Sequence, residues 1–171
     1  NLAVYLANFE ASGGKVLSKE EKFKFSLGNA VIEGRIDRIE QTPDGNVVIA
    51  DLKTGKQVTS KEDTKLHPQL GLYQLAYKHG ALAELIQVEG DVDLGGAKLL
   101  FVSGDSATER QQEGLTDDTQ KYFEDLVWKA AEQMAMPDKT FVAKVSSHCD
   151  VDSEFGTCHL HLVKAVSYFG Q

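Results

Sequence analysis

The sequence predicts a mixed α/β fold in which an antiparallel strand meander precedes a helix, a further strand and a second helix. Three observations support this prediction. Residues 19–27 alternate polar and apolar side chains with a period of two, as in a half-exposed strand. Turn signals follow at residues 28–29 and 43–46, where Gly stands next to Asn. Apolar residues then recur at helical spacing in 64–79 and 116–135.

The three strands of the meander are expected at residues 19–27, 30–40 and 47–53. Short turns join neighbouring antiparallel strands, so these strands should pair in sequence order. The third, "VVIADLK", is an apolar run that ends in charged residues, which is unexpected for a buried strand.

The second half of the chain is expected to supply two helices and a fourth strand. The helix at about 64–79 follows a loop, and its apolar face is formed by Leu66, Leu70, Tyr73 and Tyr77. Residues 97–104 predict the strand. The helix at 116–135 starts with Asp residues that suit the helix dipole. Its core-facing positions are Phe123, Leu126, Val127 and Met134. The tail at 141–171 has no clear pattern.

Length and composition are those of one globular domain spanning residues 1–171. Hydrophobic residues make up 42% and charged residues 26% of the chain. The sequence has neither an apolar run long enough to span a membrane nor a secretory signal. Two cysteines are too few for a disulfide scaffold, so we expect a reducing, cytoplasmic location. The chain opens at Asn1 without Met in a helix-like pattern, from which we expect a fragment of a longer protein.

The net charge of −8 argues against a free-standing nucleic-acid binder, because phosphate contacts require clustered Lys and Arg. The two halves differ, however. Residues 1–78 contain 11 basic and 10 acidic side chains, whereas residues 79–171 contain 7 and 16. Any contact with DNA is therefore expected in the first half, with Arg35, Arg38 and Lys56 as candidates.

Charged residues on the second and third strands predict a metal site. Asp37 lies on the second strand, and the hairpin brings it beside Asp51 at the end of the third. Two neighbouring carboxylates repel each other unless a cation lies between them or one is protonated. Mg²⁺ and Mn²⁺ favour carboxylate and carbonyl oxygens, so the backbone carbonyl of Leu52 is a further candidate ligand. Lys53 would then stand beside the metal, where an ammonium can orient water or stabilise charge on phosphate.

The same charges have a simpler interpretation as surface ion pairs at a strand end, which is the usual role of a single Asp or Lys. The combination of an Asp, a hairpin turn and an apolar strand ending Asp-x-Lys is harder to explain in that way.

The motifs "GRIDRIE", "VVIADLKTGK" and "HPQLGLYQLAY" resemble those of the PD-(D/E)XK nuclease superfamily, specifically the RecB-like nuclease domains of UvrD/Rep-type (superfamily 1) helicases. The resemblance implies a restriction-endonuclease-like core, with a mixed sheet flanked by helices. It also implies metal ligation by Asp37 and Asp51 and a catalytic role for Lys53. Gln69 and Tyr73 match the helix pair that supports such sites, and residues four apart lie on one helix face.

The resemblance further implies an Mg²⁺- or Mn²⁺-dependent deoxyribonuclease, of exonuclease type, that acts in DNA repair or recombination. In such proteins an ATP-dependent helicase motor on the same polypeptide supplies the grip on DNA. A second helicase–nuclease subunit is another candidate partner.

Two features depart from the family pattern. Many RecB-like nucleases carry a further ligand, often His, well before the first Asp, but no His precedes Asp37 here. Glu10 and Glu33 are alternatives that no pattern selects, and both are expected to be solvated. His67 lies two residues from Gln69, so we expect it at the helix start or on the surface.

The second departure concerns the cysteines. Some relatives hold an iron–sulfur cluster with four cysteines, but this chain has only Cys149 and Cys158, so a cluster is not expected. A zinc site that also uses His148, His159 or His161 is an alternative, although the spacing fits no common zinc pattern. Ordinary cysteines, or remnants of a cluster, are equally consistent with the sequence.

Two other functional interpretations remain open. One is a catalytically retired nuclease fold that contacts DNA or braces the helicase. The other is a small-molecule- or protein-binding α/β domain in which the charges are incidental.

Overall fold

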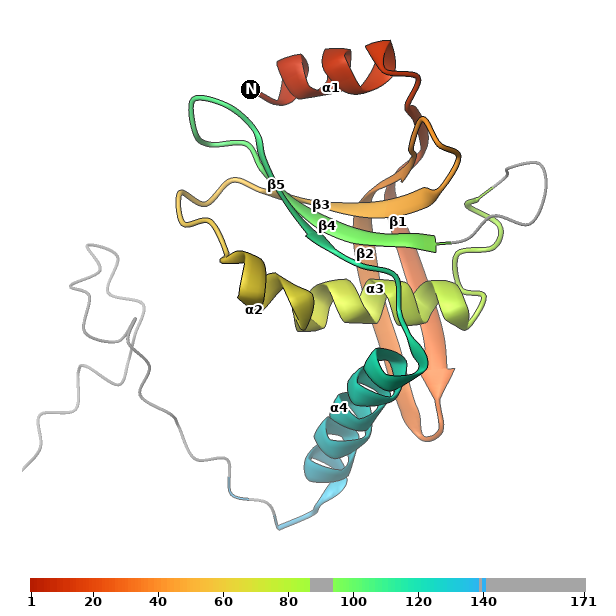
Figure 1. Cartoon of the computed structure of the whole chain (residues 1–171). Coiled ribbons are helices and arrows are strands. Elements are labelled where there is room, and N and C mark those ends of the chain that lie inside the picture. Colours follow the sequence, from red (N-terminus) through yellow and green to blue (C-terminus); the bar gives the residue numbers. More distant parts are fainter. Residues whose placement is uncertain (87–93, 139, 141–171) are drawn as a thin grey trace, which may run out of the picture. The chain divides into compact units, whose positions relative to one another are not determined.

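Five strands form one mixed sheet in the order β1-β2-β3-β4-β5, and helices pack on both of its faces (Figure 1). The computed structural model describes residues 1–86, 94–138 and 140. The elements are α1 (Leu2–Ala11), β1 (Lys15–Leu27), β2 (Ala30–Gln41), β3 (Val47–Lys53), α2 (Lys61–Lys65), α3 (Pro68–Lys78), β4 (Leu94–Phe101), β5 (Thr108–Gln112) and α4 (Asp117–Ala135).

The predicted α/β fold class is confirmed, and so is the meander. β1 pairs with β2 and β2 with β3, both antiparallel. The first connection is the two-residue turn between Leu27 and Ala30, in which Gly28 has φ +56°. That left-handed conformation carries no steric cost in glycine. The β3 bounds agree with the predicted strand at 47–53.

The pairing of β3 with β4 is parallel, so the chain must cross one face of the sheet between them. Within the described part of this crossover lie α2 and α3. The first five residues of β3 are buried, as expected for a central strand covered on both faces. Of these two faces of the sheet, α3 covers the one to which the side chains of Ile49 and Asp51 project.

The core lies between this face and α3, and α4 closes it from the side. Ile49, Leu70, Leu75 and Leu99 are fully buried there. Gly71 of α3 permits close contact with α4, because a Cβ at this position would lie 2.4 Å from the ring of Phe123. These contacts fix the position of α3 over the end of β3.

Three sequence predictions about these elements were wrong in detail. The helix predicted at 64–79 is divided into α2 and α3, because the ring of Pro68 does not fit inside a continuous helix. Leu66 lies at the break and is 45% exposed, although the sequence predicts it on the apolar face of the helix. Met134 is 77% exposed and also lies outside the core. The polar strand β5, "TERQQ", was not predicted.

On the opposite face, α1 covers a cluster of buried charges. Glu40 is 0% exposed and lies between Arg38, at 2.8 Å, and Lys98, at 2.9 Å. Lys98 also donates a hydrogen bond to the Tyr5 hydroxyl of α1 at 2.7 Å and lies 5.5 Å from the centre of the Phe9 ring. α1 has no fully buried residue, so this charged cluster is a main part of its attachment to the sheet.

Residues Asn1–Ala135 form one compact unit, and most of the chain from Met136 to Gln171 lies outside the described residues. The predicted tail at 141–171, with Cys149, Cys158 and the three nearby His residues, falls in this undescribed part. Among the described residues, no helix combines the length and the apolar character needed to cross a membrane.

Candidate active site at the end of β3

β2 separates from β3 at the position of the two predicted metal ligands. The paired residues of the ladder end at Arg38 and Ala50, and the next pair in this register would be Asp37 opposite Asp51. Instead of this backbone pairing, the Asp37 side chain connects the two strands. Its Oδ2 accepts a hydrogen bond from the backbone N–H of Leu52 at 2.7 Å. The carboxylate of Asp37 thereby reaches the end of β3.

The separation coincides with an irregularity in β2. Ile36 and Ile39 are both fully buried in the core although they are three residues apart, so the period-two alternation is interrupted between them. On β1, Glu20 lies between the ladder pairs Lys19–Arg38 and Glu21–Ile36 and has φ +56°, a left-handed conformation that is uncommon outside glycine. The strands therefore bend at the point where Asp37 enters the site.

Asp51 is buried, and one of its oxygens is held from two sides by α3. Oδ1 accepts hydrogen bonds from Gln69 Nε2 at 2.7 Å and from the Tyr73 hydroxyl at 2.9 Å. The Gln69 amide also donates to the Tyr73 oxygen at 2.8 Å. The four-residue spacing on α3 thus brings both side chains to the same carboxylate oxygen, which fixes its orientation.

Lys53 lies at the other oxygen of Asp51. Its Nζ is 2.7 Å from Asp51 Oδ2 and donates a hydrogen bond to Gln69 Oε1 at 2.9 Å. Oδ2 is buried and receives no hydrogen bond with favourable angles, so its contact with Lys53 is best described as an ion pair. Gln69 therefore holds the carboxylate with its nitrogen and the ammonium with its oxygen.

Burial and the charges at the site also shift the pKa values of Tyr73 and His67. Burial, followed by the negative charge of Asp51, raises the pKa of Tyr73, so its hydroxyl remains a proton donor at neutral pH. The same hydroxyl lies 3.2 Å from the backbone carbonyl of Arg35, which links α3 to β2. Burial, followed by the charge of Lys53, lowers the pKa of His67.

The backbone carbonyl of Leu52 points toward the Asp37 side of β3. The carbonyl of Lys53 accepts from Val102 N at 3.0 Å, so it faces β4. Successive carbonyls of a strand point in opposite directions, and the Leu52 N–H already bonds Asp37 on the β2 side. The carbonyl predicted as a ligand is thus on the same side of the strand as the Asp37 carboxylate.

The three predicted DNA contacts differ in accessibility. Arg35 and Lys56 are exposed. Arg38 is 5% exposed and pairs with the fully buried Glu40 on the α1 face. Arg38 thus faces the cluster under α1, and its contact with DNA stays a prediction.

The candidates for an additional ligand lie outside this cluster. Glu10 is exposed in α1, and Glu33 is exposed and ion-paired with Lys24 at 2.5 Å, which lowers the Glu33 pKa. His67 is the residue that precedes α3, as predicted for a helix start, and its Nδ1 is buried without a hydrogen-bond partner. Within residues 1–86 and 94–138, three or more His, Cys, Asp or Glu side chains do not converge on one point.

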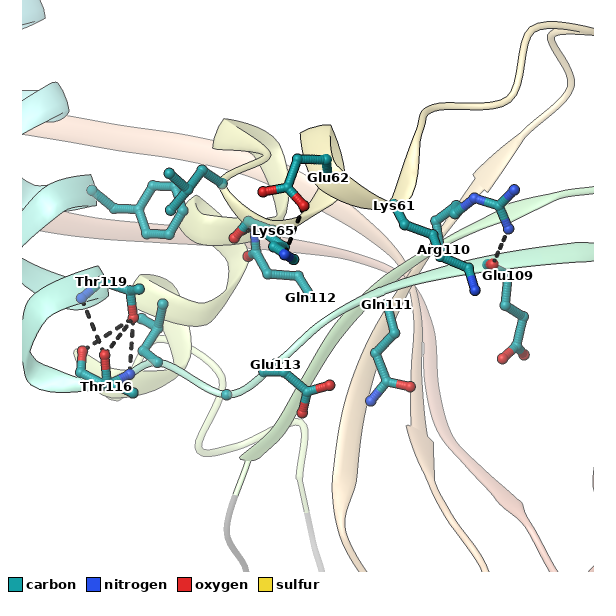
Figure 2. A pocket seen from close by; sticks show the side chains of 14 residues that line it. Lys61, Glu62, Lys65, Glu109, Arg110, Gln111, Gln112, Glu113, Thr116 and Thr119 are labelled. Carbon is teal, nitrogen blue, oxygen red and sulfur yellow. Dashed lines mark hydrogen bonds and ion pairs between the residues drawn. The ribbon is translucent and has the colours of Figure 1, made fainter.

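A separate pocket of about 730 Å³ lies between α2, β5 and the start of α4 (Figure 2). Gln112 lines it and donates hydrogen bonds to the carbonyls of Thr64, Lys65 and His67, which tie β5 to the crossover. Its cations are Lys61, Lys65 and Arg110, and its acids are Glu62, Glu109 and Glu113. The charges balance, and none of the five predicted catalytic residues lines the pocket, so we assign it no role in catalysis.

The family model of the PD-(D/E)XK nuclease superfamily matches residues 2–158, which include every residue of the site just described. The chain belongs to the PD-(D/E)XK nuclease superfamily. Its mixed five-stranded sheet flanked by helices is consistent with the restriction-endonuclease-like fold, and membership indicates a nuclease module.

Comparison with individual proteins adds little to this assignment. No curated protein sequence matches the chain significantly. A solved structure described as "Crystal structure of SSO0001" is 16% identical, with a TM-score of 0.44. The match covers 82% of this chain and 59% of that one, so the present chain spans less than two thirds of the other protein's length.

Proposed function

We propose that this nuclease module is a divalent-metal-dependent deoxyribonuclease, of exonuclease type, that hydrolyses phosphodiester bonds of DNA. The observation that carries the proposal is the connected set of Asp51, Lys53, Gln69 and Tyr73, with the Asp37 carboxylate alongside. In a chain of a nuclease superfamily, this set provides both anionic oxygens and a positioned ammonium.

The donor atoms fit Mg²⁺ or Mn²⁺. Asp37, Asp51 and the Leu52 carbonyl offer hard oxygen ligands from two neighbouring strands, and water can complete the coordination. The Asp51 oxygen that faces Lys53 receives no well-aligned hydrogen bond and so retains capacity for a cation. A bound divalent ion would polarise the phosphate and lower the pKa of water.

The protein groups have distinct roles in this proposal. The ammonium of Lys53 donates hydrogen bonds to the attacking water or to the phosphoryl oxygens. Its compact positive charge stabilises the negative charge that develops on the phosphate. Gln69 fixes the positions of Lys53 and Asp51 relative to each other through one hydrogen bond to each. Tyr73 orients Asp51, and its raised pKa keeps the hydroxyl protonated for this purpose.

We further propose that the module acts within an ATP-dependent helicase–nuclease in DNA repair or recombination. This part rests on the RecB-like motif resemblance and on charge. With a net charge of −8, the chain should bind DNA only weakly and through its first half, so helicase motor domains of the same polypeptide would supply most of the affinity. A second helicase–nuclease subunit and a cytoplasmic location belong to the same proposal.

One observation favours the alternative of a catalytically retired fold. Among the described residues, only Asp37 and Asp51 offer carboxylates at the site, and a third His, Cys, Asp or Glu ligand does not join them. A site with too few ligands would bind a divalent ion weakly. The intact ion pair of Lys53 with Asp51 favours the active interpretation.

A cleavage assay on end-labelled linear DNA and on closed circular DNA tests the proposal. The protein should degrade linear DNA with added Mg²⁺ or Mn²⁺, and EDTA should stop it. Asp51→Asn should abolish cleavage, whereas Asp105→Asn, the same change at an exposed residue between β4 and β5, should not. Metal-independent cleavage, or equal activity of both variants, would refute the assignment. DNA binding without cleavage would favour the retired fold.

A further inference from the structure

Two cations face each other on the exposed side of the β1–β2 hairpin. Lys22 of β1 lies directly opposite Arg35 of β2 in the antiparallel ladder, and both residues are exposed. Side chains at such positions have Cβ atoms about 5 Å apart, and like charges there are destabilising. A protein retains such a pair at a cost in stability, which an anionic partner would offset.

Neighbouring acids neutralise the other cations of this surface but not Lys22. Lys24 forms an ion pair with Glu33 across the ladder at 2.5 Å, and Arg35 lies 3.3 Å from Glu20. Within the described part of the chain, Lys22 has neither an ion pair nor a side-chain hydrogen bond. The surface thus retains one uncompensated positive charge beside the Arg35 guanidinium.

The two cations border a shallow groove. Its volume is about 510 Å³, and it is lined by Lys22, Phe23, Lys24, Glu33, Gly34 and Arg35. Lys22 and Arg35 form one end, and the neutral Lys24–Glu33 pair forms the other. A single anionic group therefore fits the Lys22–Arg35 end best.

This groove end lies close to the proposed catalytic residues. Arg35 is two residues before Asp37, a separation of about 6.5 Å along a strand. The carbonyl of Arg35 lies 3.2 Å from the Tyr73 hydroxyl, which also bonds Asp51. The Lys22 and Arg35 side chains themselves project from the other face of the hairpin, because the ring of Phe23, next to Lys22, packs against Tyr73 on the α3 face. An anion held by these two cations would therefore belong to a part of the DNA that runs along the outside of the hairpin.

We propose that Lys22 and Arg35 together bind a backbone phosphate of the DNA substrate outside the active site, on the exposed face of the hairpin. This inference rests on the proposed function and adds a substrate-positioning surface to it. Such a contact reads no base sequence, and it fixes the register of the strand on the hairpin.

A salt series of DNA-binding measurements tests this contact in the full chain. The probe is a fluorescein-labelled linear duplex in EDTA, so that binding is measured without cleavage. Each lost phosphate contact lowers the slope of log affinity against log salt by about 0.9. Lys22→Gln should show this loss, with weaker binding at low salt. The control is Lys129→Gln, which removes the same charge from an exposed position on α4 and should leave the slope unchanged.

Charge reversal supplies a second readout, which a merely structural lysine would not give. Lys22→Glu would face Arg35 with an opposite charge, so the melting temperature should stay level or rise while DNA affinity falls further. Equal effects of Lys22→Gln and Lys129→Gln, or no DNA binding by the wild-type chain at low salt, would overturn the inference. Asp51→Asn should lose cleavage but keep the wild-type slope of log affinity against log salt. This result would show that DNA binding by Lys22 and Arg35 can be tested independently of the catalytic proposal.

Discussion

The ammonium of Lys53 lies 2.7 Å from the Asp51 carboxylate, and the amide of Gln69 bonds both groups. A buried carboxylate requires compensation for its charge, and in this arrangement Lys53 provides it. A divalent ion at the same carboxylate would take over that compensation. Lys53 and the proposed metal would therefore be coupled through the Asp51 carboxylate, which leads to different expectations for variants of Lys53 and of Asp51.

Replacing Lys53 should separate catalysis from metal binding. Lys53→Met should lose cleavage, because the ammonium that stabilises developing charge on the phosphate and orients the attacking water is removed. It should keep the metal-induced rise in melting temperature, since an ammonium cannot ligate Mg²⁺. Lys53→Arg should also lose cleavage, because a planar guanidinium does not reproduce a compact charge beside Gln69. Cleavage rates and melting curves with and without Mn²⁺ measure both properties. Wild-type rates in Lys53→Met would remove Lys53 from the mechanism.

Asp51→Asn should remove the stabilisation by metal. An ion that binds only the folded state raises the melting temperature in proportion to the logarithm of its concentration. The wild-type protein should show this rise with Mg²⁺ or Mn²⁺, and Asp51→Asn should not. Asn keeps the shape of the side chain, so the hydrogen bonds from Gln69 and Tyr73 to Oδ1 can persist. An equal rise in the variant would place the ion elsewhere on the protein.

The two glutamates that contact Lys98 should differ strongly in their contribution to stability. Glu40 is fully buried, and Glu40→Gln leaves Arg38 and Lys98 without their shared anion, which costs about 3–5 kcal/mol. The Glu109 side chain is 42% exposed, so Glu109→Gln should cost less than about 1 kcal/mol. Urea denaturation measures both. Similar losses of unfolding free energy in Glu40→Gln and Glu109→Gln would mean that water reaches the charged cluster under α1.

His67 should make stability depend on pH. Burial and the charge of Lys53 lower its pKa in the folded state, so the unfolded chain takes up the proton first as the pH falls. The contribution of neutral His67 to the free energy of unfolding is complete above the ordinary His pKa of about 6.5. It is lost as the pH falls from about 6.5 through the lowered pKa of His67 in the folded state. His67→Asn should therefore lose less melting temperature than the wild type between neutral and mildly acidic pH. Parallel pH profiles would refute this role.

Local patterns were sufficient to predict most of the sheet. The bounds of β3 and the turn at 43–46 follow from apolar runs and Gly-Asn signals, which are properties of adjacent residues. β5 could not be found in this way, because its polar sequence pairs with β4 at the sheet edge. The division between α2 and α3 follows from Pro68, whose ring excludes it from the interior of a helix.

The site was predictable in its members but not in its connections. The resemblance selected Asp37, Asp51 and Lys53, and strand alternation placed Asp51 and Lys53 on one face. The bond from Leu52 to Asp37 depends on the separation of β2 from β3, which arises from packing between segments distant in sequence. The pairing of Arg38 with the buried Glu40 under α1 likewise depends on tertiary packing that local sequence patterns do not show.

The parallel pairing of β3 and β4 has a consequence for how this chain tolerates changes in length. The crossover carries Gln69 and Tyr73 back to the end of β3, so residues 54–60 act as a spacer that sets where α3 meets Asp51. Arg110 holds this spacer through the Thr59 carbonyl at 3.0 Å. Added residues there would displace the helix that carries Gln69 and Tyr73, whereas the turn at 43–46 joins the opposite end of β3. Fusion partners or tags inserted into that turn should leave the contacts of α3 with Asp51 unchanged.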